Sequence, residues 1–506
     1  MIQTASRLDL VQEYYFSQKL KEIAALNAEG KNIINLGIGS PDLPPHENVV
    51  KALTDSALSA KNHAYQSYIG IPALREAIAA WYQRFFGVSL NPVNEVLPLL
   101  GSKEGIMHAC MAYLQAGDVA LVPNPGYPTY RAAVLLSGAQ VLDYELDASN
   151  NWLIDFENLE QKDLSKVKVM FVNYPNMPTG AKANRAFFTD LVAFAKKHNI
   201  LIINDNPYDF ILNESYMSLL SIDGAEGHVL ELNSLSKSHN MAGWRVGMMC
   251  GHKDLISNVL KFKSNMDSGM FLPVQHAAIA ALNLDESWSK LLNVIYKKRQ
   301  QKVFELLELL DCQYDTNQTG MFVWAKIPDF YKDGYELSDK TLYGANVFIT
   351  PGGIFGSKGN GYVRVSLCAD VAVFENAIER IKTKFIAKME VLKQVQYFDF
   401  RPNEAEILLL NELVSDKSHN QHQYVVRQIQ DAKDPSSVPY LKKALENDFD
   451  IFPAYVYSES GVIAKWFSHA LFQIGTPEAI QVLKDFSLSE DEGISKEMKY
   501  RLAKVR

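Results

Sequence analysis

Residues 234–245 read SLSKSHNMAGWR and give the strongest indication of how this chain folds. They follow Val229–Leu232, a largely apolar run that predicts a β-strand buried within a parallel sheet. Lys237 and the hydroxyl groups beside it are therefore expected just beyond the carboxyl end of that strand. In open α/β sheets, ligands bind at this edge.

The side chains in this segment suit a phosphorylated ligand that is joined to an amine. The guanidinium of Arg245 can form two hydrogen bonds with phosphate oxygens, and the hydroxyls of Ser234 and Ser236 can donate one each. Lys237 can form a Schiff base. On spacing alone, however, a solvated loop lysine beside a structural arginine remains the simpler interpretation.

A second segment strengthens the ligand hypothesis. Residues 202–208 read IINDNPY, which places Asp205 at the end of a buried strand and Tyr208 three residues later. A buried carboxylate is costly unless it has a partner. A protonated pyridine nitrogen is a fitting partner, because an acid beside that nitrogen tunes the electronics of a cofactor ring.

Two further turns add weaker indications. Residues 99–106 read LLGSKEGI, a strand followed by a glycine turn and a helix start, so the backbone N–H groups of residues 102–104 are expected to form an anion site. Residues 124–130 read NPGYPTY, a rigid turn that can present the ring of Tyr127. By itself, each pattern is also typical of an ordinary turn.

Short β-rich runs alternate with amphipathic helical stretches up to about residue 390. Predicted helices include Lys103–Leu114, Arg185–His198 and a long helix from about Ser287, with Lys297–Arg299 on its solvated face. This rhythm predicts an α/β domain with a mostly parallel sheet. The predicted strands are Ile33–Leu36, Val96–Leu100, Val119–Val122, Lys168–Val172, Ile200–Asn204, Val229–Leu232, Val246–Cys250 and Tyr362–Leu367.

Residues 402–506 read differently, because they contain short amphipathic helices and no predicted strand. Asp434–Lys442 and Thr476–Lys484 resemble each other at an offset of 42 residues (476 minus 434), and each follows a helical stretch. A repeat of about 40–47 residues is typical of HEAT units. Two copies are equally consistent with a plain helical extension.

Length, composition and charge limit the classes of protein to which this chain can belong. A chain of 506 residues has room for about three domains. With 47% hydrophobic and 21% charged residues, it is not expected to be disordered or fibrous. A net charge of −8 argues against a nucleic-acid binder, and no apolar run reaches the ~18–20 residues of a membrane span. Four distant cysteines and no recognisable signal peptide predict a cytoplasmic protein without a metal site.

Taken in order, these motifs resemble those of fold-type I, pyridoxal-phosphate-dependent aminotransferases of class I/II. The resemblance covers roughly residues 10–390 and rests on Gly39, Tyr65, Gly70, Gly101–Lys103, Asn124–Tyr127, Pro178–Gly180, Asp205, Tyr208, Ser234, Lys237, Arg245 and Arg364. Residues 100–106 and 265–269, and more weakly 14–17, are most similar to LL-diaminopimelate aminotransferase-like members.

The resemblance implies a domain organisation. Residues 41–284 would form a large pyridoxal-phosphate-binding domain with a mostly parallel, seven-stranded sheet. Residues 1–40 and 285–392 would form a smaller α/β domain, and residues 400–506 would form an α-helical, HEAT-like extension. The function of that extension, and any protein partner of it, stays open.

The resemblance also implies a role for each residue at the cofactor. Lys237 would hold pyridoxal phosphate as a Schiff base and carry the proton, Asp205 would keep the pyridine nitrogen protonated, Tyr208 would bond the phenolic oxygen, and Tyr127 would stack on the ring. The phosphate would be held by Ser102, Lys103 through its backbone, Ser234, Ser236 and Arg245.

Other residues would bind the substrate, a small α-amino acid or 2-oxo acid. Arg364 would bind the α-carboxylate, Gly39 would close over it, and Tyr14 would face the substrate. Tyr65 would reach the cofactor site of a second subunit, which implies a homodimer. The implied activity is ping-pong transfer of an amino group. A carbon–sulfur β-lyase and a cofactor-binding scaffold with little turnover are alternatives on the same fold.

One position departs from the family pattern. The family's turn usually reads Asn-Pro-Thr-Gly, and its asparagine bonds the phenolic oxygen of the cofactor, whereas residues 174–180 read YPNMPTG and place Met177 there. A thioether donates no hydrogen bond. We expect the loss of a charged hydrogen bond of ~1.5–3 kcal/mol, or one to two decades in rate, without loss of catalysis.

Overall fold

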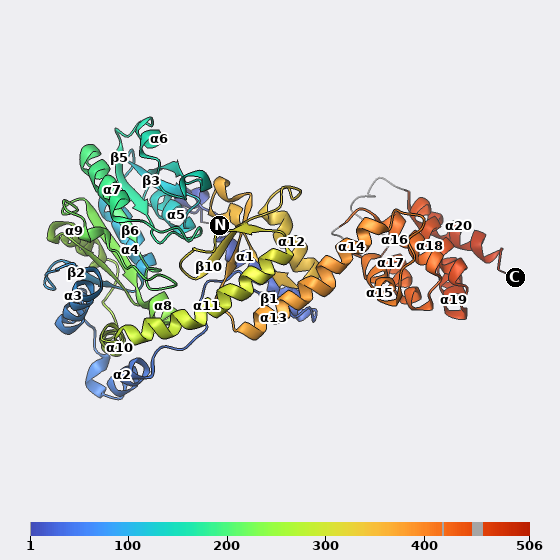
Figure 1. Ribbon diagram of the computed structural model, residues 1–506, viewed down its shortest axis with the longest axis horizontal. Helices are drawn as coiled ribbons and strands as arrows, with labels where there is room; N and C mark the ends of the chain where they lie inside the picture. Colours follow the sequence, from blue (N-terminus) through green and yellow to red (C-terminus); the bar gives the residue numbers. More distant parts are fainter. Residues whose placement is uncertain (1, 417–418, 448–458, 506) are drawn as a thin grey trace. The chain divides into compact units, whose positions relative to one another are not determined.

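The computed structural model describes residues 2–416, 419–447 and 459–505 (Figure 1). The chain forms two compact units. The first comprises the chain up to Ser338 together with Phe348–Glu375, and the second comprises Asp339–Val347 together with the chain from Asn376. Among the described residues, no helix is both long enough and apolar enough to cross a bilayer.

The first unit is built on a mixed, mostly parallel sheet of seven strands, as the sequence predicts. Its strand order is β2-β8-β7-β6-β5-β3-β4. The strands are β2 (Val96–Leu99), β3 (Val119–Asn124), β4 (Gln140–Glu145), β5 (Val167–Val172), β6 (Leu201–Asp205), β7 (Val229–Ser234) and β8 (Gly247–Gly251). β8 runs antiparallel to β2 and β7, and the other neighbours pair in parallel. The carboxyl ends of β2, β3, β5, β6 and β7 therefore lie at one edge.

Each face of this sheet carries its own hydrophobic core. In β5, Val169 and Phe171 belong to one core and Met170 and Val172 to the other, because successive residues of a strand point to opposite faces. Helices on both faces explain why the central strands are apolar along their length. The first core includes residues of α4 (Ser102–Tyr113), α5 (Pro128–Leu136) and α9 (Lys253–Lys263), and the second includes residues of α6 (Phe156–Glu160) and α7 (Arg185–His198).

The first unit contains further helices and a second, smaller sheet. A third core joins α2 (Glu47–Ala57), α3 (Pro72–Phe86) and α10 (Leu272–Leu282). The smaller sheet is antiparallel in its pairings, with the order β12-β13-β10-β9. Its strands are β9 (Gln313–Tyr314), β10 (Phe322–Lys326), β12 (Thr350–Pro351) and β13 (Tyr362–Ser366). Other elements of this unit are α1 (Tyr15–Ala28), β1 (Ile34–Asn35), α8 (Leu235–Ser238) and α11 (Glu286–Leu309). Three further elements contain residues of both units: α12 (Gly334–Ala345), β11 (Val347–Phe348) and α13 (Val371–Arg380).

The structure corrects the expectation that Lys297–Arg299 lies on a solvated face of α11. Lys297 and Lys298 are exposed, but Arg299 is only 2% exposed. Its guanidinium donates to both carboxylate oxygens of Asp42, at 2.7 Å each, and to the carbonyl oxygen of Leu367 at 3.1 Å. Arginine tolerates this position because its planar fork matches a carboxylate, and a run of three basic residues does not reveal which one has such a partner.

The C-terminal part of the second unit is helical, as predicted for residues 400–506. Its helices beyond residue 386 are α14 (Ala387–Gln394), α15 (Glu404–Leu413), α16 (His422–Ala432), α17 (Val438–Glu446), α18 (Ser460–Ile474), α19 (Pro477–Phe486) and α20 (Glu492–Leu502), and no strand occurs in the described part of 402–505. One core joins these helices. The two similar segments both begin with a side-chain cap: Asp434 accepts from the N–H of Ser436, and Thr476 accepts from the N–H of Ala479.

Candidate active site

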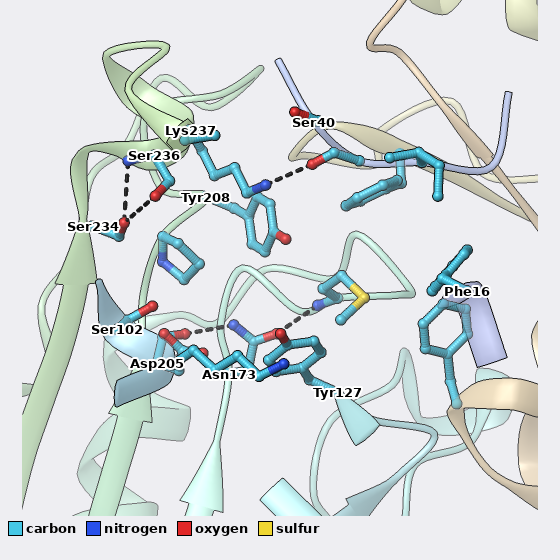
Figure 2. Close-up of a pocket in the computed structure, with 18 of the residues that line it drawn as sticks. Phe16, Ser40, Ser102, Tyr127, Asn173, Asp205, Tyr208, Ser234, Ser236 and Lys237 are labelled. Atoms are coloured by element: carbon cyan, nitrogen blue, oxygen red, sulfur yellow. Dashed lines mark hydrogen bonds between the residues drawn. The ribbon is translucent and has the colours of Figure 1, made fainter. Parts of the chain in front are cut away.

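A cavity of about 370 Å³ lies where β2, β3, β5, β6 and β7 end (Figure 2). Its walls contain every predicted site residue except Tyr65, which is 91% exposed and does not line it. The predicted residues that do line it are Tyr14, Gly39, Ser102, Lys103, Tyr127, Asp205, Tyr208, Ser234, Ser236, Lys237, Arg245 and Arg364.

Lys237 extends into this cavity from the short helix that follows β7. Ser234 caps that helix, because its Oγ accepts a hydrogen bond from the N–H of Ser236 at 3.1 Å. The Nζ of Lys237 donates to the carbonyl oxygen of Gly39 at 2.6 Å (Figure 2). Burial lowers the pKa of the Lys237 ammonium below its ordinary value. This favours the neutral amine that a nucleophile or a general base requires.

Asp205 ends β6 and has one unused carboxylate oxygen. Its Oδ2 accepts from the hydroxyl of Tyr130 at 2.9 Å. Its Oδ1 is buried and has no hydrogen-bond partner among the described residues. Burial raises the pKa of this carboxyl to about 6. An unpaired buried oxygen is costly, so the site fits a ligand that brings an N–H group, such as a protonated ring nitrogen.

A second part of the cavity has the donors that an anion needs. α4 begins at Ser102 without a side-chain cap, so its first N–H groups and the positive end of its dipole are available. Gly101 has φ = 93°, and a Cβ on it would lie 2.2 Å from Nη2 of Arg245, which places the guanidinium directly over the turn. The hydroxyls of Ser234 and Ser236 lie 2.8 Å apart at the same place. These groups fit a phosphate.

Arg364 provides a buried positive charge in another wall. Its Nη2 donates to the carbonyl oxygen of Gly37 at 2.8 Å, its Nη1 donates to Sδ of Met177 at 3.2 Å, and its Nε is buried without a partner among the described residues. The guanidinium carbon lies 3.8 Å from the ring centre of Phe322 and 4.6 Å from that of Phe355. Burial lowers the pKa of this group to about 10, so it remains charged at neutral pH. A carboxylate suits it.

The turn that carries Met177 does not supply another amide to the cavity. The Met177 N–H donates to Oδ1 of Asn173 at 2.7 Å. The side chain of Asn176 donates to the carbonyl oxygen of Asn173 at 3.1 Å and accepts from the hydroxyl of Thr179 at 2.8 Å. Asn176 is thus held inside its own turn and does not line the cavity.

Several lining residues were not assigned a role from the sequence. Tyr130 lies in the quoted NPGYPTY turn, three residues after Tyr127, and that spacing was its only signal. Phe355 belongs to the glycine-rich stretch before β13, and its backbone carbonyl accepts from the N–H of Gly126 at 2.8 Å. Phe322, on β10, has no sequence signal, because an aromatic residue in a strand is ordinary core composition.

The tyrosines and Lys103 complete the walls. Burial raises the pKa of Tyr127 and of Tyr208, and it raises the pKa of Tyr14 to about 12, so these phenols stay protonated and can donate. The Nζ of Lys103 lies 5.2 Å from the ring centre of Tyr14. A cation is therefore present near Tyr14 as well as at Arg364.

The chain is similar to known aminotransferases over most of its first unit. The family model for aminotransferase class I and II matches residues 31–381. An LL-diaminopimelate aminotransferase of Dehalococcoides mccartyi is 41% identical over 382 residues, which cover 74% of this chain and 97% of the relative. An LL-diaminopimelate aminotransferase of Nitratidesulfovibrio vulgaris is 39% identical over 380 residues, which cover 74% of this chain and 98% of the relative.

Solved structures agree with this similarity. A substrate-bound BacF structure from Bacillus subtilis has a TM-score of 0.73 and 37% identity, covering 76% of this chain and 98% of that one. The structure of an aromatic aminotransferase from Pyrococcus horikoshii has a TM-score of 0.67 and 26% identity, and the match covers 74% of this chain and 99% of that one. With this family match, and with a cavity that fits the pyridine nitrogen and phosphate of the family cofactor, the chain belongs to the class I and II aminotransferases and is a pyridoxal-phosphate-dependent transaminase.

Proposed function

We propose that transfer of the amino group takes place in the cavity around Lys237, with the residue roles that follow. The observation that carries this proposal is the grouping, in one cavity, of the Lys237 amine, the unpaired Oδ1 of Asp205 and the charged Arg364. Pyridoxal phosphate supplies an electron sink that stabilises negative charge on the substrate's α-carbon. The protein supplies binding, orientation and proton transfer.

On the cofactor side, each group has a defined task in this proposal. The Oδ1 of Asp205 accepts from the protonated ring nitrogen, while Tyr130 holds Oδ2. The start of α4 with Ser102 and Lys103, together with Ser234, Ser236 and Arg245, holds the phosphate. Tyr127 packs on the ring, and Tyr208 donates to its phenolic oxygen. Lys237, whose pKa is lowered by burial, bonds the cofactor and later moves the proton.

On the substrate side, Arg364 binds the α-carboxylate. Its guanidinium lies beside the rings of Phe16, Phe322 and Phe355, a wall that excludes water and strengthens the ion pair with the substrate. Gly39 closes over the same carboxylate. It already lies at the site, because its carbonyl oxygen accepts a hydrogen bond from Nζ of Lys237. Tyr14 contacts the remainder of the substrate.

For the amino donor, we propose LL-diaminopimelate, with a dicarboxylic 2-oxo acid as acceptor. The curated relatives carry that name, and both kinds of molecule end in a second carboxylate. Lys103 offers a cation for that carboxylate, because Lys103 lines the cavity and its Nζ lies 5.2 Å from the ring centre of Tyr14. The second candidate is an aromatic amino acid, which is favoured by the three phenylalanines around Arg364.

Single-turnover half-reactions with separate amino acids distinguish the two candidates. The wild-type protein is expected to convert LL-diaminopimelate and glutamate with a higher kcat/KM than phenylalanine. Lys103→Gln is expected to lower kcat/KM for the dicarboxylic substrates by about tenfold, through loss of a charge pair, and to leave phenylalanine unchanged. A preference for phenylalanine that is independent of Lys103 would favour the aromatic donor.

We also propose that the active enzyme is a cytoplasmic homodimer in which Tyr65 reaches the other subunit's cofactor. Its 91% exposure outside the cavity of its own chain supports this. Inactive Lys237→Ala chains mixed with Tyr65→Ala chains are expected to regain the activity of one intact site.

For the organisation of the chain, we propose a large domain (41–284), a small domain (1–40 with 285–392) and a HEAT-like extension from residue 400 that offers a surface to a protein partner.

A further inference from the structure

Phe355 reaches the cavity from a glycine-rich stretch between β12 and β13, and the fold has to hold that stretch in place. The stretch forms two short 3-10 helices, Gly352–Phe355 and Ser357–Gly359. The Phe355 side chain is buried in the cavity wall, and its ring centre lies 4.6 Å from the guanidinium carbon of Arg364. The position of this stretch therefore decides how well the Arg364 guanidinium is covered.

Asn124, the last residue of β3, holds the stretch through its buried side chain. Its Nδ2 donates to the hydroxyl oxygen of Ser357 at 2.9 Å, and its Oδ1 accepts from the backbone N–H of Lys358 at 3.1 Å. Two residues after Asn124, the N–H of Gly126 donates to the carbonyl oxygen of Phe355 at 2.8 Å. These three hydrogen bonds, here called the clasp, join segments that are more than 200 positions apart in the chain.

The clasp depends on a close approach at Gly356. A Cβ at that position would lie 2.2 Å from Oδ1 of Asn124, and its φ of 132° is one that residues with a side chain rarely adopt. Asn124 cannot move aside to make room without giving up its bonds to Ser357 and Lys358. The amide of Asn124 and the bare backbone of Gly356 are therefore fitted to each other.

The other side of the clasp is anchored in the central sheet. The carbonyl oxygen of Asn124 accepts from the N–H of Leu146 at 2.8 Å, and β3 pairs with both β4 and β5. Tyr127, three residues after Asn124, lines the same cavity. The clasp thus connects the end of the sheet, and the turn that presents Tyr127, to the stretch that covers Arg364.

An ion pair lies beside the clasp but is exposed. The Nζ of Lys358 lies 2.9 Å from Oε2 of Glu145, and the two side chains are 36% and 59% exposed. Exposed ion pairs stabilise little, because water and salt screen them. Loss of the Glu145 charge leaves all three hydrogen bonds of the clasp in place, so this residue offers a matched control.

We propose that Asn124 is a positioning residue for substrate recognition, whose amide holds Phe355 over Arg364 and thereby strengthens the ion pair between Arg364 and the α-carboxylate of the substrate. This inference rests on the proposed role of Arg364 in binding that carboxylate. The ion pair is stronger where an apolar ring keeps water away from it. The clasp involves neither Lys237 nor Asp205, so its loss weakens substrate binding and changes the chemical step little.

The test is the single-turnover half-reaction of the full-length holoenzyme with glutamate and with phenylalanine, which separates the apparent Kd of the amino acid from the limiting rate. Asn124→Leu keeps the approximate volume and removes both side-chain bonds, whereas Asn124→Asp can still accept from the N–H of Lys358 and from the Ser357 hydroxyl. We expect Asn124→Leu to raise Kd about tenfold for both amino acids, because the α-carboxylate is common to them, with a limiting rate within about threefold of the wild type. Asn124→Asp is expected to restore most of the affinity, and Glu145→Gln is expected to keep Kd within about twofold of the wild type.

An unchanged Kd in Asn124→Leu would overturn the proposal. A limiting rate that falls as far as the affinity, or a matching loss of pyridoxal phosphate in equilibrium dialysis, would also overturn it, because either result would indicate a general structural role. If Asn124→Leu does not fold, Ser357→Ala and Gly356→Ala decide instead: each is expected to raise Kd about threefold or more, and wild-type affinity in both would refute the proposal.

Arg364→Gln separates this inference from the assignment on which it rests. If that variant binds both amino acids as tightly as the wild type does, the carboxylate assignment and the role of the clasp both fail. If it binds them weakly while Asn124→Leu matches the wild type, the role of the clasp alone fails.

Discussion

Met177→Asn is expected to make the enzyme faster. In the structure Arg364 Nη1 donates to Sδ of Met177 at 3.2 Å, a bond to a weak acceptor. Asparagine places its amide oxygen and nitrogen the same number of bonds from Cα as Sδ, so the oxygen can take over the bond from Arg364. The amide nitrogen adds a donor for the phenolic oxygen of the cofactor. One charged hydrogen bond of ~1.5–3 kcal/mol corresponds to about 10- to 100-fold in kcat/KM.

The assay is the single-turnover half-reaction with the best amino donor, at equal cofactor content and with Tm measured for each variant. Met177→Leu is the matched control, because it keeps the volume and removes the acceptor. It leaves Nη1 of buried Arg364 unpaired and should lower kcat/KM by about fivefold, or ~1 kcal/mol. A folded, cofactor-loaded Met177→Asn that is no faster than the wild type would refute the idea that the site lacks a donor. A Met177→Leu variant equal to the wild type would show that the sulfur bond contributes nothing.

Two other predictions concern stability. Without cofactor, burial raises the pKa of Asp205 to about 6, above the ordinary value of ~3.9. The protonated Asp205 carboxyl therefore stabilises the folded state at low pH, and this stabilisation is lost as the pH rises through 6. Urea unfolding of cofactor-free protein at pH 5 and pH 7.5 should show a loss of about 1–3 kcal/mol that Asp205→Asn abolishes; an equal loss in both proteins would contradict this. Asp42→Ala should lower Tm, because it leaves the 2%-exposed Arg299 charge without its carboxylate at a cost of about 2–4 kcal/mol, while Lys297→Ala, on the exposed face of the same helix, should leave Tm within 1–2 °C.

Local patterns were sufficient to predict the central sheet and its ligand edge. Continuous apolar runs such as Ile200–Asn204 predicted buried parallel strands. The strand found there, β6 (Leu201–Asp205), is offset from the predicted range by one position. The family resemblance of the motifs after those strands predicted one cofactor site for Ser102, Tyr127, Asp205 and Lys237, and all four line one cavity. Both inferences succeed because they depend on the spacing of apolar residues and on the order of the motifs along the chain, which can be read directly from the sequence.

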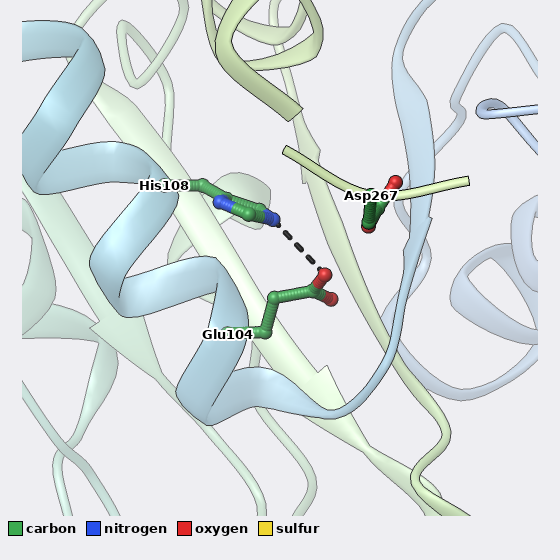
Figure 3. Close-up of side chains that lie close together, drawn as sticks. All are labelled: Glu104, His108 and Asp267. Atoms are coloured by element: carbon green, nitrogen blue, oxygen red, sulfur yellow. Dashed lines mark ion pairs between the residues drawn. The ribbon is translucent and has the colours of Figure 1, made fainter. Parts of the chain in front are cut away.

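Other features depend on contacts between residues far apart in the chain. Arg299 and Asp42 are separated by 257 positions, and no local pattern distinguishes Arg299 from its neighbouring lysines. Phe322 and Phe355 reach the cavity from different segments, and Met177 becomes a partner of Arg364 across 187 positions. Glu104 and His108 of α4 (Ser102–Tyr113) likewise lie close to Asp267, which belongs to a distant loop (Figure 3).

The sequence by itself determined the fold class and the family, since these follow from the side chains present and their order. Only the tertiary structure decided which polar atoms have no partner among the described residues, such as Oδ1 of Asp205 and Nε of Arg364, and which charges are buried. The physical reason is that burial and pairing are properties of the surroundings of a group. Those surroundings exist only after distant segments have packed together.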